Sequence, residues 1–313
     1  MKLAFLYAGQ GSQCPGMGRD LYDAYPAFRR AFDAAELDFD LHRVCFEDPD
    51  GVLNETQYTQ PCMVAFAAGL TAVLYENGIV PAYAAGLSLG EYSALHAAGV
   101  FDAKTAIELT AFRGRAMAEA ARGIPCGMTA VLGLGRDALA DCCARAADRG
   151  VVQICNYNCP GQLVIGGEQA AVDAAAALAR EAGAKRCMPL KVSGPFHTAL
   201  MHPAGDALAE KFRRISFGEM RFPVLFNCLG RELTPQDKTD IPALLERQVQ
   251  SSVYMEDTIR RLAELGVDTV IEIGPGKALS GFVRKTVGGQ IAYHPVGTAA
   301  ELEALLNTWK ETV

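Results

Sequence analysis

Residues 86–90 read Gly-Leu-Ser-Leu-Gly, and this stretch carries the strongest chemical signal in the chain. It matches the pattern Gly-x-Ser-x-Gly, in which a sharp turn between a strand and a helix lifts a serine hydroxyl out of the backbone. Residues 82–85 are short and apolar, and residues 91–98 continue without a helix breaker, as that geometry requires. The following helix would direct its N–H groups at Ser88 and stabilise negative charge there. We therefore predict that Ser88 is a nucleophile rather than a small residue in a tight turn.

A serine nucleophile needs a base, because its hydroxyl is a weak nucleophile at neutral pH. The chain offers five histidines, which are His42, His96, His197, His202 and His294. His96 lies two turns along the helix after Ser88, which carries it away from the turn, and His42 and His202 lie within helical stretches. His294 follows the last strand pattern, where α/β-hydrolases place their base, whereas His197 lies in a Gly-Pro turn between two predicted domains. The residues alone do not decide whether His197 or His294 is the base.

An oxyanion hole requires backbone N–H donors that face the serine. Leu89, the residue after Ser88, supplies one donor by its position, and the loop around Gln10 after the first strand is a candidate for the second. That loop also starts like the dinucleotide-binding pattern Gly-x-Gly-x-x-Gly, but its sixth position is Cys14 and Pro15 follows. We therefore predict an oxyanion hole here and no nucleotide cofactor.

Arg113 lies inside a predicted helix and is followed by Gly114. A glycine within a helix costs about 1 kcal/mol relative to alanine, so it indicates close packing at that point. A guanidinium beside such a packed position can bind a carboxylate through two hydrogen bonds. The alternative, which these residues favour on their own, is an arginine on a solvated helix face.

Alternating strands and helices position these residues. We predict a strand at 3–8, helices at 27–37 and 62–78, the serine turn, and a helix at 103–121 that Asp102 caps. After residue 195 we predict helices up to 214 and at 241–248, 255–265, 277–285 and 299–310, with strands at 222–227 and 269–273. This alternation is typical of a parallel sheet, so the predicted fold class is α/β.

Residues 126–195 follow a different order. We predict a strand at 128–133, a helix at 136–148, strands at 151–157 and 162–166, a helix at 168–182 and a strand at 185–192. The order strand-helix-strand-strand-helix-strand is that of the ferredoxin-like unit. We therefore predict a small ferredoxin-like domain at 126–195, inserted into a catalytic domain that residues 1–125 and 196–313 form together.

Composition and charge exclude several classes of protein. The 313 residues are 50% hydrophobic, which is enough for a full core. No apolar run is long enough for a transmembrane helix, which needs roughly 18 residues. The formal net charge of −7 argues against a nucleic-acid or membrane surface. The ten cysteines contain no Cys-x-x-Cys pair, so we predict reduced thiols, a cytoplasmic location and no structural zinc or other metal site.

Six blocks of sequence occur in order along the chain. They are Gly-Gln-Gly-Ser-Gln at 9–13, Gly-Leu-Ser-Leu-Gly-Glu-Tyr at 86–92, Phe-Arg-Gly-Arg at 112–115, Asn-Tyr-Asn-Cys-Pro-Gly-Gln at 156–162, Gly-Pro-Phe-His at 194–197 and Glu-Ile-Gly-Pro-Gly at 272–276. Together they resemble the malonyl-CoA:acyl carrier protein transacylases over residues 3–285. The resemblance implies a hydrolase-like α/β domain with a nucleophile elbow and an inserted ferredoxin-like domain. It also implies transfer of malonyl from malonyl-CoA to acyl carrier protein in fatty-acid synthesis.

The resemblance implies roles for the candidate residues. His197, rather than His294, would be the base, and a backbone carbonyl near a glutamine, which matches Gln248 here, would orient its ring. The N–H groups of Gln10 and Leu89 would form the oxyanion hole. The reaction would proceed through a malonyl-serine ester, with neither a cofactor nor a metal.

Selectivity in this family is attributed to an arginine that matches Arg113. It would hold the malonyl carboxylate, and an acetyl group would leave it unpaired. Phe196, directly before the base, goes with malonyl in related polyketide acyltransferases. The sequence departs from the family at Leu87, where a histidine is usual. That change affects the backing of the turn and leaves the nucleophile intact.

The partners that the resemblance implies are malonyl-CoA and acyl carrier protein, without nucleic acid or membrane, and nothing in the sequence requires more than a monomer. Because carrier proteins are acidic and this chain is acidic overall, docking needs a local basic patch. The candidates are Lys185, Arg186 and Lys191, or Arg284 and Lys285. Three alternatives remain: an acyltransferase that serves a polyketide synthase in trans, a serine esterase or thioesterase, and a non-catalytic module that binds carrier protein.

Overall fold

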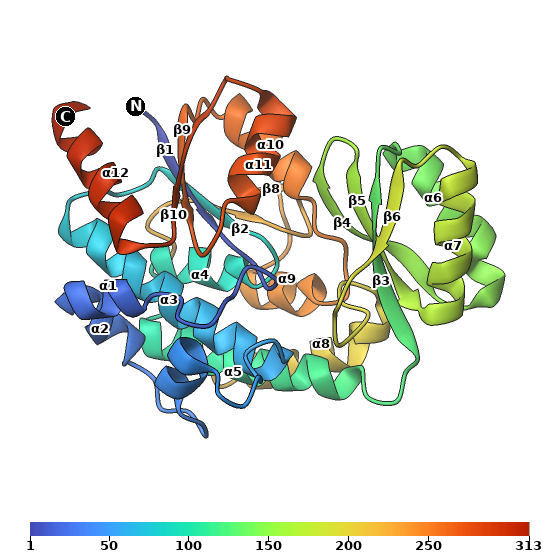
Figure 1. Ribbon diagram of the computed structural model, residues 1–313, viewed down its shortest axis with the longest axis horizontal. Coiled ribbons are helices and arrows are strands. Elements are labelled where there is room, and N and C mark those ends of the chain that lie inside the picture. The colour runs from blue at the N-terminus through green and yellow to red at the C-terminus, as the bar shows by residue number, and fades with distance from the viewer. Residues whose placement is uncertain (313) are drawn as a thin grey trace. The chain divides into compact units, whose positions relative to one another are not determined.

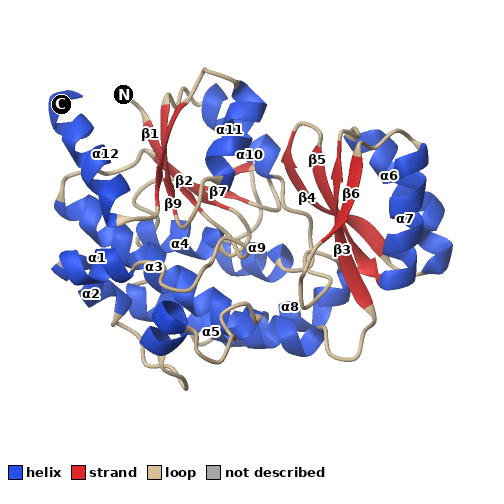
Figure 2. Cartoon of the chain, viewed as in Figure 1, coloured by secondary structure: helices blue, strands red, loops and turns tan. Residues whose placement is uncertain are grey.

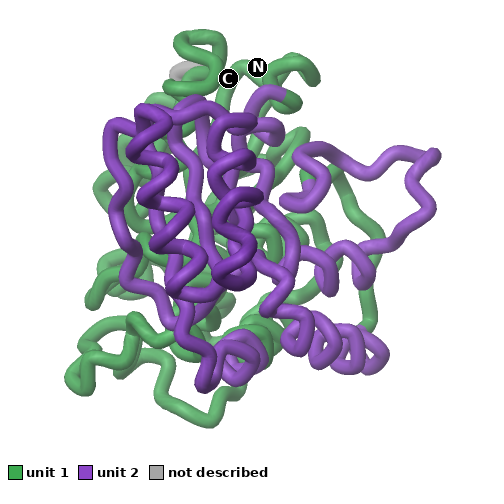
Figure 3. The backbone as a smooth tube through the Cα atoms, turned by 90° about the vertical axis from the view of Figure 1, so that its right-hand side faces the viewer, with its two compact units in different colours: residues 1–114, 216–225, 261–313 green, residues 115–215, 226–260 purple. Residues whose placement is uncertain are grey.

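The computed structural model describes residues 1–312, and the chain forms two compact units, which Figure 3 shows in green and purple. The first unit comprises residues 1–114, 216–225 and 261–313, and the second comprises residues 115–215 and 226–260. The predicted small domain of residues 126–195 falls inside the second unit, which extends beyond that domain at both ends. Val313, the last residue of the predicted catalytic domain, lies outside the described residues.

A parallel sheet forms the centre of the first unit (Figure 1, Figure 2). Within this unit the strands of the sheet lie in the order β10-β9-β1-β2-β7, with the bounds β1 (Leu3–Tyr7), β2 (Tyr83–Gly86), β7 (Val224–Phe226), β9 (Thr269–Ile273) and β10 (Ala292–Val296). β1 pairs in parallel with β2 and with β9, so Phe5 lies level with Ala84 and with Ile271. All residues of β1 are buried, as expected of a strand in the middle of a parallel sheet. The predicted α/β class is confirmed.

Helices cover this sheet. In the first unit they are α1 (Arg19–Ala24), α2 (Pro26–Phe32), α3 (Thr56–Glu76), α4 (Gly90–Ala97), α5 (Ala103–Ala120), α11 (Ala278–Val287) and α12 (Ala299–Thr312), with a π-helical turn η1 (Arg43–Glu47). α4 packs on β1 and β2, whereas α11 and α12 pack on β10 and flank the strands from opposite sides in Figure 1. Because β1 and β2 are parallel, the loops that follow them, with Gln10 and Ser88, leave the same edge of the sheet.

The start of α3 differs from the prediction. We predicted a helix start at Cys62, after Pro61, but the helix begins at Thr56 and contains Pro61. A proline inside a helix forfeits one backbone hydrogen bond, and the burial of most of this helix offsets that loss. As a result, Thr56 and Gln60 belong to the helix rather than to a preceding loop.

The second unit contains an antiparallel sheet in the order β4-β5-β3-β6 (Figure 1). Its elements follow the chain as β3 (Cys126–Leu132), α6 (Arg136–Ala146), β4 (Val152–Cys159), β5 (Gln162–Glu168), α7 (Gln169–Glu181) and β6 (Arg186–Pro189). This is the predicted order of strands and helices. α6 and α7 lie on one face of the sheet, where Val131, Ile154 and Ile165 pack against Leu139 and Val172.

The same unit holds several of the elements that follow β6. They are η3 (Ala199–Met201), α8 (His202–Phe212), β8 (Arg231–Glu232), α9 (Ile241–Gln248) and the larger part of α10 (Met255–Glu264), and a turn η2 (Ala147–Arg149) follows α6. α9 has the predicted bounds, and the Asp240 side chain caps it by accepting the Ala243 N–H at 2.9 Å. After α9 the chain returns to the edge of the antiparallel sheet, where the Tyr157 N–H donates to the Val253 carbonyl at 2.8 Å.

Other predicted bounds are wrong. α2 ends at Phe32 rather than at residue 37, and β6 ends at Pro189 rather than at residue 192. β10, which contains Pro295, was not predicted. This strand lies at the edge of its sheet, where a missing N–H costs no ladder hydrogen bond. His294 therefore lies within a strand and not after the last one.

Candidate functional site

Ser88 occupies the turn between β2 and α4. Its backbone φ is +52°, a left-handed conformation that is uncommon for residues other than glycine. Within residues 1–312, the non-glycine residues with a positive φ are Asp48, Ser88 and His197. Such strain persists only where surrounding contacts enforce it, and it concentrates at functional positions. The backbone therefore distinguishes two of the predicted site residues.

Close backbone contacts explain the glycines around this turn. A Cβ on Gly86 would lie 2.0 Å from the carbonyl carbon of Gly90, and a Cβ on Gly90 would lie 2.3 Å from the Tyr7 carbonyl oxygen. A Cβ on Gly9 would lie 2.5 Å from the Leu87 carbonyl oxygen. A side chain at any of these glycines would push away the backbone that carries the serine.

Arg113 reaches the serine from α5. Its side chain is 1% exposed; Nη2 donates to Ser88 Oγ at 3.3 Å, and Nη1 donates to Gln60 Oε1 at 2.8 Å. The guanidinium also lies over the Tyr92 ring, 5.3 Å from the centroid. Burial lowers the pKa of Arg113, but an arginine keeps its proton in proteins. The alternative of a solvated arginine is wrong, because a buried positive charge lies beside the serine hydroxyl.

Gly114 lets α5 approach the start of α3. A Cβ on Gly114 would lie 2.6 Å from the Thr56 carbonyl oxygen, so the predicted close packing at this glycine is confirmed. The Thr56 hydroxyl accepts a hydrogen bond from Gln10 Nε2 at 3.0 Å. The same helix thus holds both the loop after β1 and, through Gln60, the guanidinium of Arg113.

Sequence reasoning missed Gln60. This side chain is 1% exposed and accepts from Arg113, although 53 positions separate the two residues in the chain. It precedes Pro61 in a polar stretch that reads as the lead-in to a helix, and no local pattern marks it as the partner of an arginine. Gln60 lies on α3 because this helix begins at Thr56 rather than after Pro61.

His197 lies in the second unit, just before η3. Its φ is +61°, and its side chain is 3% exposed. Its N–H donates to the Val249 carbonyl at 3.0 Å, and its Nδ1 lies 2.9 Å from the Gln248 carbonyl oxygen. A carbonyl oxygen only accepts, so Nδ1 carries the proton in this bond and Nε2 is the nitrogen that can take one. A general base needs this tautomer, and the catalytic roles of His197 and Gln248 stay predictions.

The other histidines have different surroundings. His294 lies within β10, level with Ile271 of the neighbouring strand. His202 stands exposed at the start of α8. His96 is partly buried, its Nδ1 lies 3.0 Å from the Phe101 carbonyl oxygen, and burial lowers its pKa. None of these three has the left-handed backbone of His197.

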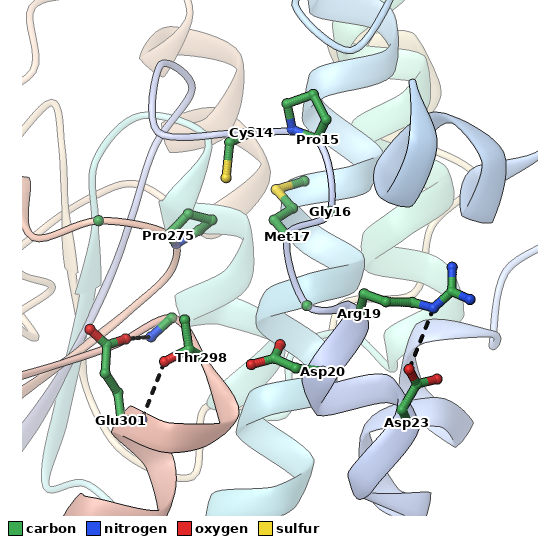
Figure 4. A pocket seen from close by; sticks show the side chains of 13 residues that line it. Cys14, Pro15, Gly16, Met17, Arg19, Asp20, Asp23, Pro275, Thr298 and Glu301 are labelled. Atoms are coloured by element: carbon green, nitrogen blue, oxygen red, sulfur yellow. Dashed lines mark hydrogen bonds and ion pairs between the residues drawn. The ribbon is translucent and has the colours of Figure 1, made fainter. Parts of the chain in front are cut away.

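A surface pocket of the first unit does not include the predicted site residues of that unit. Its volume is about 580 Å³, and residues 14–20, 275–276 and 297–298 line it together with Asp23 and Glu301 (Figure 4). The charged groups in it bind one another or the backbone. Arg19 pairs with Asp23 at 3.5 Å, and Glu301 accepts the Gly297 N–H at 2.8 Å. No histidine lines this pocket, so it lacks the base that a serine nucleophile needs.

Three further findings concern the described part of the chain. No group of three or more His, Cys, Asp or Glu side chains there is arranged to hold a metal ion. No helix among residues 1–312 has both the length and the apolar character needed to cross a membrane. All ten cysteines are present as thiols.

Comparisons with known proteins cover nearly the whole chain. The family model of the acyl transferase domain matches residues 4–306. The malonyl CoA-acyl carrier protein transacylase of Bacillus subtilis is 41% identical over 313 residues, which span 99% of this chain and 98% of that protein. The crystal structure of MCAT from Streptococcus pneumoniae is 45% identical, with a TM-score of 0.92, and the match covers 98% of this chain and all of that one. A malonyl-transacylase in complex with a type II PKS acyl-carrier protein is 38% identical, with a TM-score of 0.92 and coverage of 98% and 100%.

Proposed function

The chain belongs to the acyl transferase domain family, and we propose that it transfers the malonyl group from malonyl-CoA to the phosphopantetheine thiol of acyl carrier protein. It is an acyltransferase, an acyl-carrier-protein S-malonyltransferase that supplies extender units for fatty-acid synthesis. The observation that carries this proposal is the 3.3 Å contact between Arg113 and Ser88, because it puts a carboxylate-binding cation beside the nucleophile. An esterase for neutral substrates has no use for that buried charge.

Ser88 and His197 carry the first half of the reaction. Ser88 Oγ attacks the thioester carbonyl carbon of malonyl-CoA while His197 Nε2 takes the hydroxyl proton. The backbone N–H groups of Gln10 and Leu89 donate to the oxyanion of the tetrahedral intermediate. The carbon–sulfur bond then breaks, CoA leaves with the proton from the imidazole, and a malonyl-serine ester remains.

The second half reverses these steps with a different thiol. The phosphopantetheine thiol of the carrier protein attacks the ester carbonyl and gives its proton to His197. The serine oxygen leaves, recovers that proton, and the malonyl group stays on sulfur. The Gln248 carbonyl holds the Nδ1–H throughout and stabilises the imidazolium that forms, a role that its 2.9 Å distance supports.

Arg113 supplies selectivity. A malonyl group on the serine carries a free carboxylate, and the neighbouring guanidinium offers paired N–H donors to it. An acetyl group lacks that carboxylate and forms no such bonds. The anchorage of Arg113 to Gln60 supports this role, because a fixed guanidinium loses little entropy when it binds a substrate.

We interpret the fold in the terms that the family implies. The strand-turn-helix around Ser88 is a nucleophile elbow in a hydrolase-like domain of residues 1–125 and 196–313. Residues 126–195 are an inserted ferredoxin-like domain. The positive φ of Ser88 and the contacts of its glycines support the first interpretation. The strand order β4-β5-β3-β6 supports the second.

The protein acts as a cytoplasmic monomer that docks carrier protein through a basic patch. The presence of all ten cysteines as thiols supports a reducing compartment. Lys185, Arg186 and Lys191 are exposed at and around β6, which supports this surface as the patch. Arg284 and Lys285, also exposed, are the alternative.

A transfer assay tests the proposal. The purified protein is mixed with malonyl-CoA and phosphopantetheinylated acyl carrier protein, and both CoA and malonyl-carrier protein are quantified. We expect equal amounts of the two products, and neither from Ser88→Ala. Release of CoA without malonyl-carrier protein would identify a thioesterase. A carrier-protein complex without either product would identify a binding module.

A second candidate function is the same reaction in polyketide synthesis. The observation that favours it is the structural match to a malonyl-transacylase solved with a type II PKS acyl-carrier protein, at 38% identity. The two pathways differ in the carrier protein and not in the chemistry. A comparison of kcat/KM for carrier proteins of the two kinds would separate them.

A further inference from the structure

We infer that Gln153, on β4, is a positioning residue that fixes the backbone of His197. The inference rests on the proposed function, because it gives His197 the role of the base. Gln153 lies in the second unit with His197, and its side-chain amide contacts the backbone directly after the histidine side chain, at residues 197 and 199. None of the motifs in the sequence points to this glutamine.

Two hydrogen bonds define the contact. Gln153 Nε2 donates to the His197 carbonyl oxygen at 3.3 Å, and Gln153 Oε1 accepts the Ala199 N–H at 3.1 Å. One planar amide thus spans residues 197–199. An apolar side chain makes neither bond, and a carboxylate keeps only the acceptor.

The strand alternation explains why Gln153 is available for this contact. Val152 and Ile154 pack on the side of the sheet that α6 and α7 cover. Because successive side chains of a strand point to opposite faces, the side chain of Gln153 points to the other face. The hydrogen bonds from its side-chain amide to residues 197 and 199 are made on that face.

The positive φ of His197 explains why such a support matters. A residue with a side chain pays free energy for this conformation, so the surrounding contacts must impose it. The His197 N–H bond to Val249 fixes one side of the residue, and the Gln153 bond to its carbonyl fixes the other. Without the bond from Gln153, the peptide group after His197 is able to rotate. The imidazole would then turn away from the Gln248 carbonyl.

β4 also binds the segment that follows Gln248, whose carbonyl is the partner of the imidazole. The Val253 N–H donates to the Cys155 carbonyl at 2.8 Å, and the Ser252 hydroxyl donates to the Ile154 carbonyl at 2.6 Å. These bonds anchor the segment that begins with the Gln248 carbonyl. One strand therefore supports both His197, through Gln153, and the carbonyl that selects its tautomer.

The test replaces Gln153 by methionine, which has a similar length and neither hydrogen-bonding group. The matched control is Gln169→Met, a surface glutamine of the same unit that bonds to Asp173 within its own helix. We expect Gln153→Met to slow the acylation of Ser88 by malonyl-CoA about tenfold in single-turnover experiments, the size expected for two neutral hydrogen bonds. The Kd for malonyl-CoA should stay close to the values of the parent and of Gln169→Met, and the loss of the two bonds should lower the melting temperature by only a few degrees.

A double-mutant cycle shows whether Gln153 acts through the histidine. In a His197→Ala background the base is absent, so Gln153→Met should cause no further loss of the residual rate. An equal loss in both backgrounds would overturn the inference. So would an acylation rate for Gln153→Met within about twofold of the parent, because that change is smaller than one such bond supplies.

Amide hydrogen exchange separates this inference from the proposed function. The Ala199 N–H should exchange faster in Gln153→Met than in the parent or in Gln169→Met, and Gln153→Glu should restore its protection because it keeps the acceptor. If the parent forms no malonyl adduct, the proposed function fails, and the exchange rates still decide whether Gln153 holds this turn. Unchanged exchange in Gln153→Met would contradict the positioning role.

Discussion

At the scale of single residues, Ser88 and His197 share a strained backbone, with φ angles of +52° and +61°. A left-handed residue with a side chain costs about 1–2 kcal/mol, so surrounding contacts must maintain each angle. Around Ser88 these are the close backbone approaches that its glycines permit, and at His197 they include the bond to the Val249 carbonyl. The strain directs one hydroxyl and one imidazole, the two groups to which we assign the proposed acyl transfer.

Replacement of Arg113 by alanine should remove the preference for malonyl. We expect kcat/KM for malonyl-CoA to fall about 10- to 100-fold, the loss expected for a charge-assisted hydrogen bond, while kcat/KM for acetyl-CoA, which has no carboxylate to lose, should change little. Arg115→Ala is the control, because Arg115 is exposed on the same helix. The account of selectivity would be wrong if both substrates lost activity in parallel.

Replacement of Gln248 by alanine should lower the stability of the fold and leave the rate of Ser88 acylation unchanged. The bond to His197 Nδ1 comes from the backbone carbonyl, which alanine keeps. The side chain is fully buried, so its removal should cost about 1–3 kcal/mol in the free energy of unfolding. Urea denaturation and single-turnover acylation measure the two effects. A large loss of rate at unchanged stability would show that the side chain, rather than the carbonyl, acts on the histidine.

The chemistry of single residues is partly readable from the sequence. Ser88 follows from local spacing, because a turn motif and its flanking elements are contiguous in the chain. The choice between His197 and His294 does not, because the carbonyl that orients the imidazole belongs to Gln248, 51 positions away. The resemblance to a family supplied that choice. Neither local spacing nor the family resemblance pointed to Gln60, because its partner Arg113 is also remote in sequence.

At the scale of elements, the periodic patterns give good predictions. α9 and β9 have the predicted bounds, and the strand-helix order of residues 126–195 is confirmed. Two of the errors involve prolines. Pro61 lies inside α3 and Pro295 inside β10, and burial of a helix or an edge position in a sheet makes each tolerable. Those conditions depend on tertiary structure, so local sequence does not report them.

Gly114→Ala tests the packing of α5 on α3. The added Cβ would lie 2.6 Å from the Thr56 carbonyl oxygen, so one helix must shift. We expect a loss of about 1–3 kcal/mol in the free energy of unfolding and slower malonyl transfer, because the adjacent Arg113 moves with its helix.

Gly281→Ala is the matched control for this change. Gly281 lies in α11, and no atom lies within 4 Å of the position of its Cβ, so alanine should stabilise the protein by about 0.5–1 kcal/mol. Thermal denaturation and the transfer assay compare the two variants. Equal stabilities for both glycine variants would contradict the packing argument.

At the scale of the whole molecule, the two units divide the chemistry. Ser88 and Arg113 belong to the first unit, whereas His197 and Gln248 belong to the second. Neither unit alone therefore carries the complete set of groups that the proposed reaction uses. The net charge of −7 adds a second requirement, because an acidic carrier protein must find a locally basic surface on an acidic partner.

Charge reversal tests that surface. Lys185 and Arg186, both changed to Glu, should raise KM for acyl carrier protein about tenfold and leave acylation by malonyl-CoA unchanged, because surface charge acts on the encounter of the two proteins. The effect should shrink at high salt. Arg213 and Arg214, exposed at the end of α8, provide a control pair with the same change of charge. An unaltered KM for the first pair would direct attention to Arg284 and Lys285.

The most direct test of the account is the intact mass of the protein after brief mixing with malonyl-CoA alone. We predict a malonyl adduct on the parent, no adduct on Ser88→Ala, and loss of the adduct when acyl carrier protein is added. Peptide mapping should place the added mass on Ser88. A parent without an adduct that releases CoA steadily into water, or an adduct that persists in Ser88→Ala, would contradict transfer through this serine.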